Sequence, residues 1–218
     1  MVEINLMERY PRTKRNLDER AEEKTEEDRS IARQWGKDFF DGDRKHGYGG
    51  FSYNSRFWTD VVQDMIKHYN LTEDSKILDI GCGKGFMLYD FKLALPGITV
   101  KGIDISEYAI ETAKEEVKEF CSVGDAKDLS EFGDKEFDLV ISVNTVHNLE
   151  KEECKQAVKE IQRVGKNAFI VVDAWRTDEE EIRMKKWNLT ALTFMHVNDW
   201  KKMFEDVAYT GDYYWFIP

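Results

Sequence analysis

Short apolar runs alternate with amphipathic segments along most of this chain. The runs are rich in β-branched residues or end at turn residues, which is typical of buried strands, and we expect strands at 77–80, 98–105, 119–123, 137–143, 168–173, 189–196 and 212–217. Between them apolar residues recur at helical spacing, and we expect helices at 54–69, 86–95, 106–118, 152–163, 177–188 and 198–204. Strands that alternate with helices predict an α/β fold with a doubly wound, mostly parallel sheet.

The first 53 residues do not show this alternation. Residues 1–16 are polar with scattered apolar positions and predict an arm or a partly disordered tail. Residues 17–40 are dense in Glu, Arg and Lys and predict a solvated helix. Residues 41–53 mix glycines with aromatic and charged residues, which predicts a loop. We therefore divide the chain into an N-terminal extension, 1–53, made of arm, charged helix and loop, and an α/β domain, 54–218.

Composition limits the function classes. The 218 residues suffice for one α/β domain with a short extension. A net charge of -11 argues against nucleic acid or an anionic membrane as partner, because both attract a basic surface. Three cysteines without metal-ligand spacing predict reduced thiols in a cytoplasmic protein and no metal site. No apolar run approaches the length of a membrane span.

One stretch, K-I-L-D-I-G-C-G-K-G-F at 76–86, carries the strongest chemical signal. An apolar strand ends in three alternating glycines, which permit positive φ and let a ligand approach the backbone. The dinucleotide fingerprint G-x-G-x-x-G requires a third glycine where Phe86 stands. Asp79, two residues before the first glycine, would repel a pyrophosphate. The loop therefore suits a ligand that carries an ammonium group and no phosphate.

This stretch resembles motif I of class I S-adenosylmethionine-dependent methyltransferases, [D/E]-x-G-x-G-x-G, at each fixed position. The resemblance covers roughly residues 71–218. It implies a Rossmann-like, seven-stranded sheet with an antiparallel C-terminal hairpin. It also implies S-adenosyl-L-methionine as methyl donor and S-adenosyl-L-homocysteine as product.

Further acids follow in the order that the resemblance implies. Asp104 ends the second expected strand, where a carboxylate accepts hydrogen bonds from ribose hydroxyls. Asp125 resembles the residue that accepts from the adenine amino group. The expected cofactor-binding residues are Asp79, Gly81, Cys82, Gly83, Asp104, Ile105, Asp125, Ala126 and Asn144.

The fourth strand ends in N-T-V-H-N-L at 144–149, a position that resembles motif IV. The N-P-P-Y type of signature is absent there. His147 is the candidate catalytic base, since its pKa near ~6.5 suits proton transfer. A structural histidine is an equal alternative. The substrate and lid candidates are Tyr48, Phe51, Tyr53, Trp175 and Arg176.

These patterns favour transfer of a methyl group to an O, N or C nucleophile of a small molecule. Two alternatives stay open. One is a non-catalytic protein that binds S-adenosylmethionine for regulation. The other is an NAD-dependent oxidoreductase, which the glycine pattern and Asp79 disfavour. The patterns leave the oligomeric state undetermined.

Overall fold

A computed structural model describes residues 1–11, 17, 24–49 and 52–218. The strands are β1 (Val2–Glu3), β2 (Lys76–Ile80), β3 (Thr99–Asp104), β4 (Cys121–Val123), β5 (Phe137–Val143), β6 (Gly165–Trp175), β7 (Met195–His196) and β8 (Asp212–Phe216). The α-helices are α2 (Glu26–Ala32), α3 (Lys37–Asp41), α4 (Ser55–Tyr69), α5 (Phe86–Ala94), α6 (Glu107–Glu111), α7 (Lys151–Val164), α8 (Asp178–Trp187) and α9 (Val197–Asp206). Short 3-10 turns are η1 (Arg44–His46), η2 (Lys118–Phe120) and η3 (Val146–Asn148).

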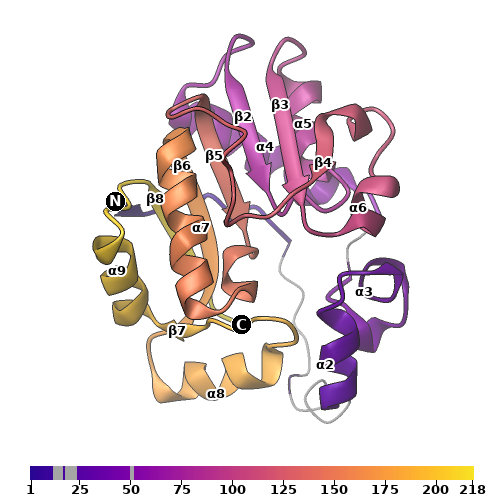
Figure 1. Cartoon of the computed structure of the whole chain (residues 1–218), viewed down its shortest axis with the longest axis vertical. Helices are drawn as coiled ribbons and strands as arrows, with labels where there is room; N and C mark the ends of the chain where they lie inside the picture. The colour runs from indigo at the N-terminus through magenta and orange to yellow at the C-terminus, as the bar shows by residue number, and fades with distance from the viewer. Residues whose placement is uncertain (12–16, 18–23, 50–51) are drawn as a thin grey trace.

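The strands form one sheet in the order β1-β8-β6-β5-β2-β3-β4, and β7 pairs with the end of β6. Within the described residues each pairing is parallel. The doubly wound, mostly parallel α/β sheet is therefore confirmed. The predicted number of seven strands is wrong: the described residues form an eight-stranded sheet, because β1 of the N-terminal segment joins its edge. The chain runs outward from β2 through β3 to β4 and returns to β5 on the other side of β2 (Figure 1). This reversal opens a crevice at the carboxyl ends of β2 and β5, where such sheets bind ligands.

The prediction of an antiparallel C-terminal hairpin is wrong. β8 runs parallel to β6, from Phe169 opposite Asp212 to Asp173 opposite Phe216. The connection between the two strands contains α8 and α9, which return the chain to the amino end of the sheet before β8 begins. The strand expected at 189–196 is reduced to β7, because its earlier backbone N–H groups bond Tyr48 and the carbonyl of His147.

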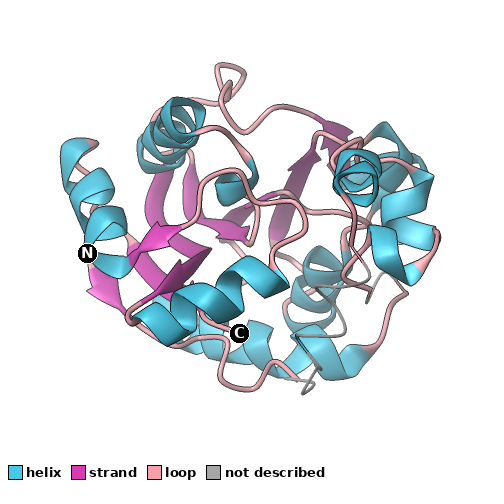
Figure 2. Ribbon diagram, turned by 90° about the horizontal axis from the view of Figure 1, so that it is seen from below, coloured by secondary structure: helices cyan, strands magenta, loops and turns pink. Residues whose placement is uncertain are grey.

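Alternating side chains of the strands build a core on each face of the sheet. On one face Leu78 and Val140 pack with α7 and α9. On the other, Ile77 and Leu139 pack with α4 and α5. Figure 2 shows helices on both sides of the strands. Removing both apolar faces from water is the main source of stability in such a layered fold.

The N-terminal segment is ordered along residues 1–11 and belongs to the packed body. β1 pairs with β8, and the Ile4 N–H donates to the Tyr213 carbonyl at 2.9 Å. The guanidinium of Arg9 contacts Asp64 on α4 at 2.6 and 2.7 Å. Part of the arm expected at 1–16 is thus an edge strand, followed by a segment that Arg9 attaches to α4.

The charged helix expected at 17–40 is interrupted within its described part. Trp35 has a φ of 54°, a left-handed conformation that ends the helical path between α2 and α3. Residues 12–16 and 18–23 lie outside the described residues. A small core cluster attaches α2 and α3 to the body: Ala32, Phe39, Phe40, Ala109 and Leu189.

Candidate cofactor and acceptor site

The glycine loop after β2 has the backbone that its sequence predicts. Gly81, Gly83 and Gly85 have φ values of 78°, 54° and 74°. A Cβ at Gly81 would lie 2.1 Å from the Thr145 hydroxyl oxygen, closer than atoms tolerate. The loop therefore passes directly beneath the segment after β5, and only glycine fits at its first turn.

Asp104, at the end of β3, supports this loop. One carboxylate oxygen accepts the Gly83 N–H at 2.8 Å, and the other accepts the Ser106 N–H at 2.9 Å. Burial raises the pKa of Asp104 above its ordinary value. Each oxygen has a second lone pair. Asp104 can thus hold the loop and accept a bond from a ligand at the same time.

A cavity of about 1540 Å³ opens along the carboxyl edge of the sheet. It brings together most of the residues that the sequence singles out. Those on its wall are Tyr48, Tyr53, Gly81, Gly83, Asp104, Ile105, Asp125, Ala126, Asn144 and His147. Asn144 has a φ of 54° where the chain leaves β5. Phe51 lies outside the described residues.

Asp79 and Cys82 lie beneath the loop rather than on the cavity wall. Asp79 is buried, and burial, followed by the nearby Cys121 and Asp104, raises its pKa well above the ordinary value. The Cys82 sulfur fills the space over Gly102, where a Cβ would come within 2.8 Å of it. Both side chains therefore shape the loop from below.

Asp125 and Ile105 occupy the rim near β4. Asp125 accepts the Lys127 backbone N–H at 2.9 Å. The Lys127 ammonium lies 3.5 Å from Asp125 and 2.8 Å from Glu153. Ile105, beside Asp104, is 54% exposed. The exposed Ile105 side chain, together with the carboxylates of Asp104 and Asp125, suits a flat polar ligand. Such a ligand could pack one face on the aliphatic side chain and form hydrogen bonds at its edges.

His147 is buried at the cavity wall, where its Nδ1 accepts the Asp173 backbone N–H at 2.9 Å. In the neutral ring the proton therefore sits on Nε2. Burial lowers the pKa of His147 to about 3. Both nitrogens are thus committed: one accepts from the backbone and the other carries the proton. This geometry favours the structural role over the role of base.

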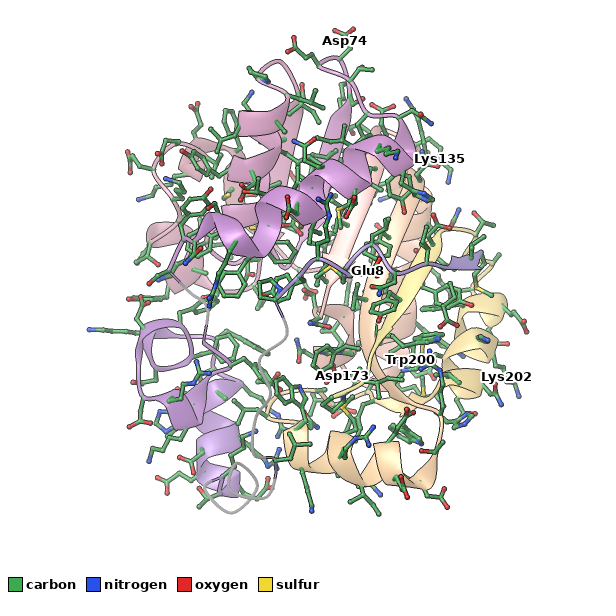
Figure 3. All side chains as sticks on the ribbon, turned by 180° about the vertical axis from the view of Figure 1, so that it is seen from behind. Glu8, Asp74, Lys135, Asp173, Trp200 and Lys202 are labelled. Atoms are coloured by element: carbon green, nitrogen blue, oxygen red, sulfur yellow. The ribbon has the colours of Figure 1, made fainter. Side chains whose placement is uncertain are left out.

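Asp173 is a cavity residue that sequence reasoning left out of the site. It lies near the carboxyl end of β6, is 3% exposed and lines the cavity. Its carboxylate lies 3.7 Å from His147 Nδ1, and burial raises the pKa of Asp173 to about 8. Figure 3 shows it at the end of the sheet opposite Asp74 and Lys135. The sequence does indicate this residue, because Asp173 follows an apolar run, as Asp104 does.

Three rings from distant segments form an aromatic wall, defined as Tyr48, Trp187 and Phe216. Tyr48 stacks on Trp187 with ring centroids 5.5 Å apart, and Trp187 lies 5.2 Å from Phe216. The Tyr48 hydroxyl accepts the Leu189 N–H at 2.8 Å. All three rings line the cavity. The loop residue Tyr48 is therefore fixed against α8 and β8.

The other substrate and lid candidates make different contacts. The Tyr53 hydroxyl donates to Asp90 on α5 at 3.2 Å, which anchors the segment before α4. Trp175 packs edge-on against Phe194. Arg176 bonds Glu3 of β1 at 2.9 Å. Within the described part of the chain, Trp175 and Arg176 do not line the cavity.

A latch connects the N-terminal extension to the glycine loop. The Lys84 ammonium donates to both carboxylate oxygens of Asp41, at 2.8 and 2.7 Å. The Tyr108 hydroxyl donates to the same carboxylate at 2.7 Å. Asp41 ends α3, Lys84 lies in the loop and Tyr108 lies on α6. The latch holds α3 over the loop, beside the cavity.

Residues 78–171 match the protein family described as "Methyltransferase domain". Over this stretch, which is less than half of the chain, the sequence matches that of a methyltransferase domain. An uncharacterized methyltransferase of Synechocystis is 34% identical over 115 residues, 51% of this chain and 52% of that protein. A ubiquinone biosynthesis O-methyltransferase of Rickettsia bellii is 29% identical over 112 residues, 48% and 45% of the two chains. The chain thus spans about half the length of the curated relatives it matches.

A solved structure shares the fold of this chain. The YcgJ protein of Bacillus superposes with a TM-score of 0.55 at 22% identity, over 67% of this chain and 66% of that one. Among the described residues, no helix combines the length and apolarity needed to cross a membrane. The described part of the chain also contains no group of three or more His, Cys, Asp or Glu suited to a metal ion.

Proposed function

We propose that the protein transfers a methyl group from S-adenosyl-L-methionine to an O, N or C nucleophile of a small molecule and releases S-adenosyl-L-homocysteine. The observation that carries this proposal is the convergence of the glycine loop, Asp104 and Asn144 on one cavity. The match to the methyltransferase family supports it over the NAD-dependent alternative.

The residues on the cavity wall fit S-adenosylmethionine. Asp104 would accept hydrogen bonds from the ribose hydroxyls with the lone pairs that the loop leaves available. Ile105 would pack on the adenine ring, and Asp125 with Ala126 would border its edge. Asn144 follows the end of β5 and lines the cavity, where it would face the methyl group. Asp79 and Cys82 would act indirectly, by supporting the loop.

When bound, S-adenosylmethionine supplies a methyl group that its sulfonium already activates. The chain's own task is to hold the acceptor in line and exclude water. Orientation of this kind lowers barriers by ~7–11 kcal/mol in well-aligned systems. The latch of Asp41 on Lys84 keeps α3 beside the cavity and so contributes to the enclosure.

A small-molecule acceptor suits a cavity with aromatic lining, and the acidic net charge of -11 disfavours nucleic acid. We also propose a cytoplasmic location. Cys82, Cys121 and Cys154 are all free thiols, which is the usual state in a reducing compartment.

The direct test is calorimetric titration of the purified protein with S-adenosylmethionine, S-adenosylhomocysteine and NAD. We expect binding of the first two and no heat from NAD. An assay with methyl-labelled donor and a panel of hydroxyl and amine acceptors should then show transfer. Binding of NAD alone would refute the proposal.

A second candidate is a non-catalytic S-adenosylmethionine-binding protein. One observation favours it: the only histidine on the described cavity wall offers no free lone pair to a substrate. Tight donor binding without label transfer to any acceptor class would support this candidate.

A further inference from the structure

The part of the cavity away from the glycine loop has its own chemistry. We call it the acceptor half and define it as Asp173 with the aromatic wall. Four separate segments contribute to it: the loop before α4, the end of β6, the end of α8 and β8. Because these segments meet only through tertiary packing, the acceptor half is a built feature of the fold.

All three residues of the aromatic wall line the cavity, and the Lys24 ammonium lies 5.9 Å from the Tyr48 ring centroid. Phe39 adds a further ring, edge-on to Tyr48 at 6.4 Å. The contacts of the Tyr48 hydroxyl with the 189–190 backbone fix the orientation of its ring. Fixed rings bind other flat rings by stacking and attract cations to their faces.

Asp173 supplies the polar group of this surface. It forms no salt bridge with a lysine or arginine among residues 1–11, 17, 24–49 and 52–218. The titratable groups that face it are His147 from η3, whose ring is neutral, and Tyr48. The basic side chains on the described cavity wall, Arg44, Arg56 and Lys127, belong to other elements. A buried carboxyl in this setting favours a ligand that brings its own positive charge.

We propose that the acceptor half binds an arylalkylamine, with its aromatic ring on the aromatic wall and its ammonium group on the carboxylate of Asp173. This compound would be the methyl acceptor, so that part of the inference rests on the proposed function. For transfer, the bound ammonium would first give one proton to the Asp173 carboxylate. The lone pair of the free amine would then form the N–CH3 bond as the S–CH3 bond breaks, leaving a methylammonium product and S-adenosylhomocysteine. Binding itself does not require methyl transfer and can be tested separately.

The proposal includes a proton balance. Burial raises the pKa of Asp173 to about 8, so the empty site holds mainly the protonated carboxyl at neutral pH. Binding of an ammonium ion stabilises the carboxylate, and the carboxyl proton is released to the buffer. The affinity for the amine should therefore rise between pH 6 and pH 8, by up to about tenfold per pH unit.

The test uses three probes that share a ring and differ in charge: phenethylamine, 2-phenylethanol and 3-phenylpropionate. Each is titrated calorimetrically into the full chain, with and without saturating S-adenosylhomocysteine. We expect phenethylamine to bind at least about tenfold tighter than the alcohol, and the carboxylate to bind weakest. Titrations in phosphate and in Tris should differ in heat, because they absorb the released proton differently.

Two variants and a control assign the roles. Asp173→Asn should remove the preference for the amine over the alcohol. Trp187→Leu should weaken both probes and keep their ratio. The control, Asp74→Asn, removes an exposed carboxylate at the opposite end of the sheet and should change nothing (Figure 3).

The outcomes separate this proposal from the methyl-transfer proposal. Equal affinity for the amine and the alcohol in the wild type, or no binding of any probe while S-adenosylhomocysteine binds, overturns the acceptor class alone. An amine preference that survives in Asp173→Asn removes Asp173 from the site. Failure of S-adenosylhomocysteine to bind overturns the proposed function, and the titrations without it still decide the amine proposal.

Discussion

The two halves of the cavity are assembled in different ways. The cofactor half comes from consecutive turns of a βαβ region, where Gly81, Gly83 and Asp104 are placed by the ends of β2 and β3. The acceptor half takes Tyr48, Asp173 and its remaining rings from segments that are distant in sequence. A site formed by backbone geometry leaves a local pattern, because only certain residues adopt that geometry. A site formed by side chains on a shared surface leaves none.

The two halves also differ in the substitutions that they tolerate. In the cofactor half, the backbone of the glycine loop itself lines the cavity, so steric fit at the glycines is decisive. In the acceptor half, side chains determine charge and shape while the scaffold beneath them stays the same. Substitutions should therefore abolish binding in the first half and change selectivity in the second.

The largest effect is expected at the first turn of the glycine loop. Gly81→Ala places a Cβ 2.1 Å from the Thr145 hydroxyl oxygen at a φ of 78°. We expect a loss of about 2–4 kcal/mol in unfolding free energy and no measurable S-adenosylmethionine binding. Denaturant unfolding and calorimetry measure both.

Gly133→Ala is the matched control, because the nearest atom to its added Cβ is 3.6 Å away. A Gly81→Ala protein that binds the donor normally would mean that the loop backbone does not determine the cofactor half.

Next in size is Asp104→Ala. It removes the acceptor of the Gly83 and Ser106 N–H groups, and with it the acceptor that we propose for the ribose hydroxyls. We expect S-adenosylhomocysteine affinity to fall by about 1–3 kcal/mol. Phenethylamine affinity in the absence of donor should stay within error, since Asp104 belongs to the other half. A parallel loss of amine affinity would show that the two halves act as one unit.

His147 supplies a pH-dependent comparison. Its folded pKa of about 3 lies below the ordinary 6.5, so the unfolded chain binds a proton that the folded chain excludes. Stability is therefore lost as the pH falls from 6.5 toward 3. Relative to wild type, His147→Asn should reduce the stability loss between pH 6.5 and 4.5 by about 2 kcal/mol.

Asp173 changes the unfolding free energy with pH in the opposite direction. Its pKa is raised in the folded state, so its contribution favours the folded state most at low pH. The difference between wild type and His147→Asn isolates the histidine. Parallel curves of unfolding free energy against pH for the two proteins would show that His147 is not excluded from protonation.

The smallest effect is expected at the latch. Asp41→Asn weakens the bond to Lys84, and because Asp41 is partly exposed we expect only about 0.5 kcal/mol. Hydrogen exchange should accelerate in α3 and in the glycine loop. Asp38→Asn, on the same helix and exposed, is the control. Unchanged exchange in α3 would show that other contacts hold the N-terminal extension in place.

Much of the fold could be predicted from local pattern. α4 begins at Ser55 behind its Asn54 cap and ends at Tyr69 as expected, and β5 covers the expected 137–143. The prediction is less accurate where packing decides. The helix expected over 106–118 ends at Glu111, and the backbone N–H of Lys114 instead donates to the Lys84 carbonyl, at 2.9 Å.

The sequence by itself determined the alternation of strands and helices and the glycine loop with its acid at Asp104. These depend on residue-level preferences: side-chain period, positive φ and the position of an acid at a strand end. Only the tertiary structure decided the direction of β8, the place of β1 at the sheet edge, the orientation of His147 and the meeting of Asp173 with the aromatic wall. The reason is that these features depend on which distant segments bury one another, and that choice is made by the whole core.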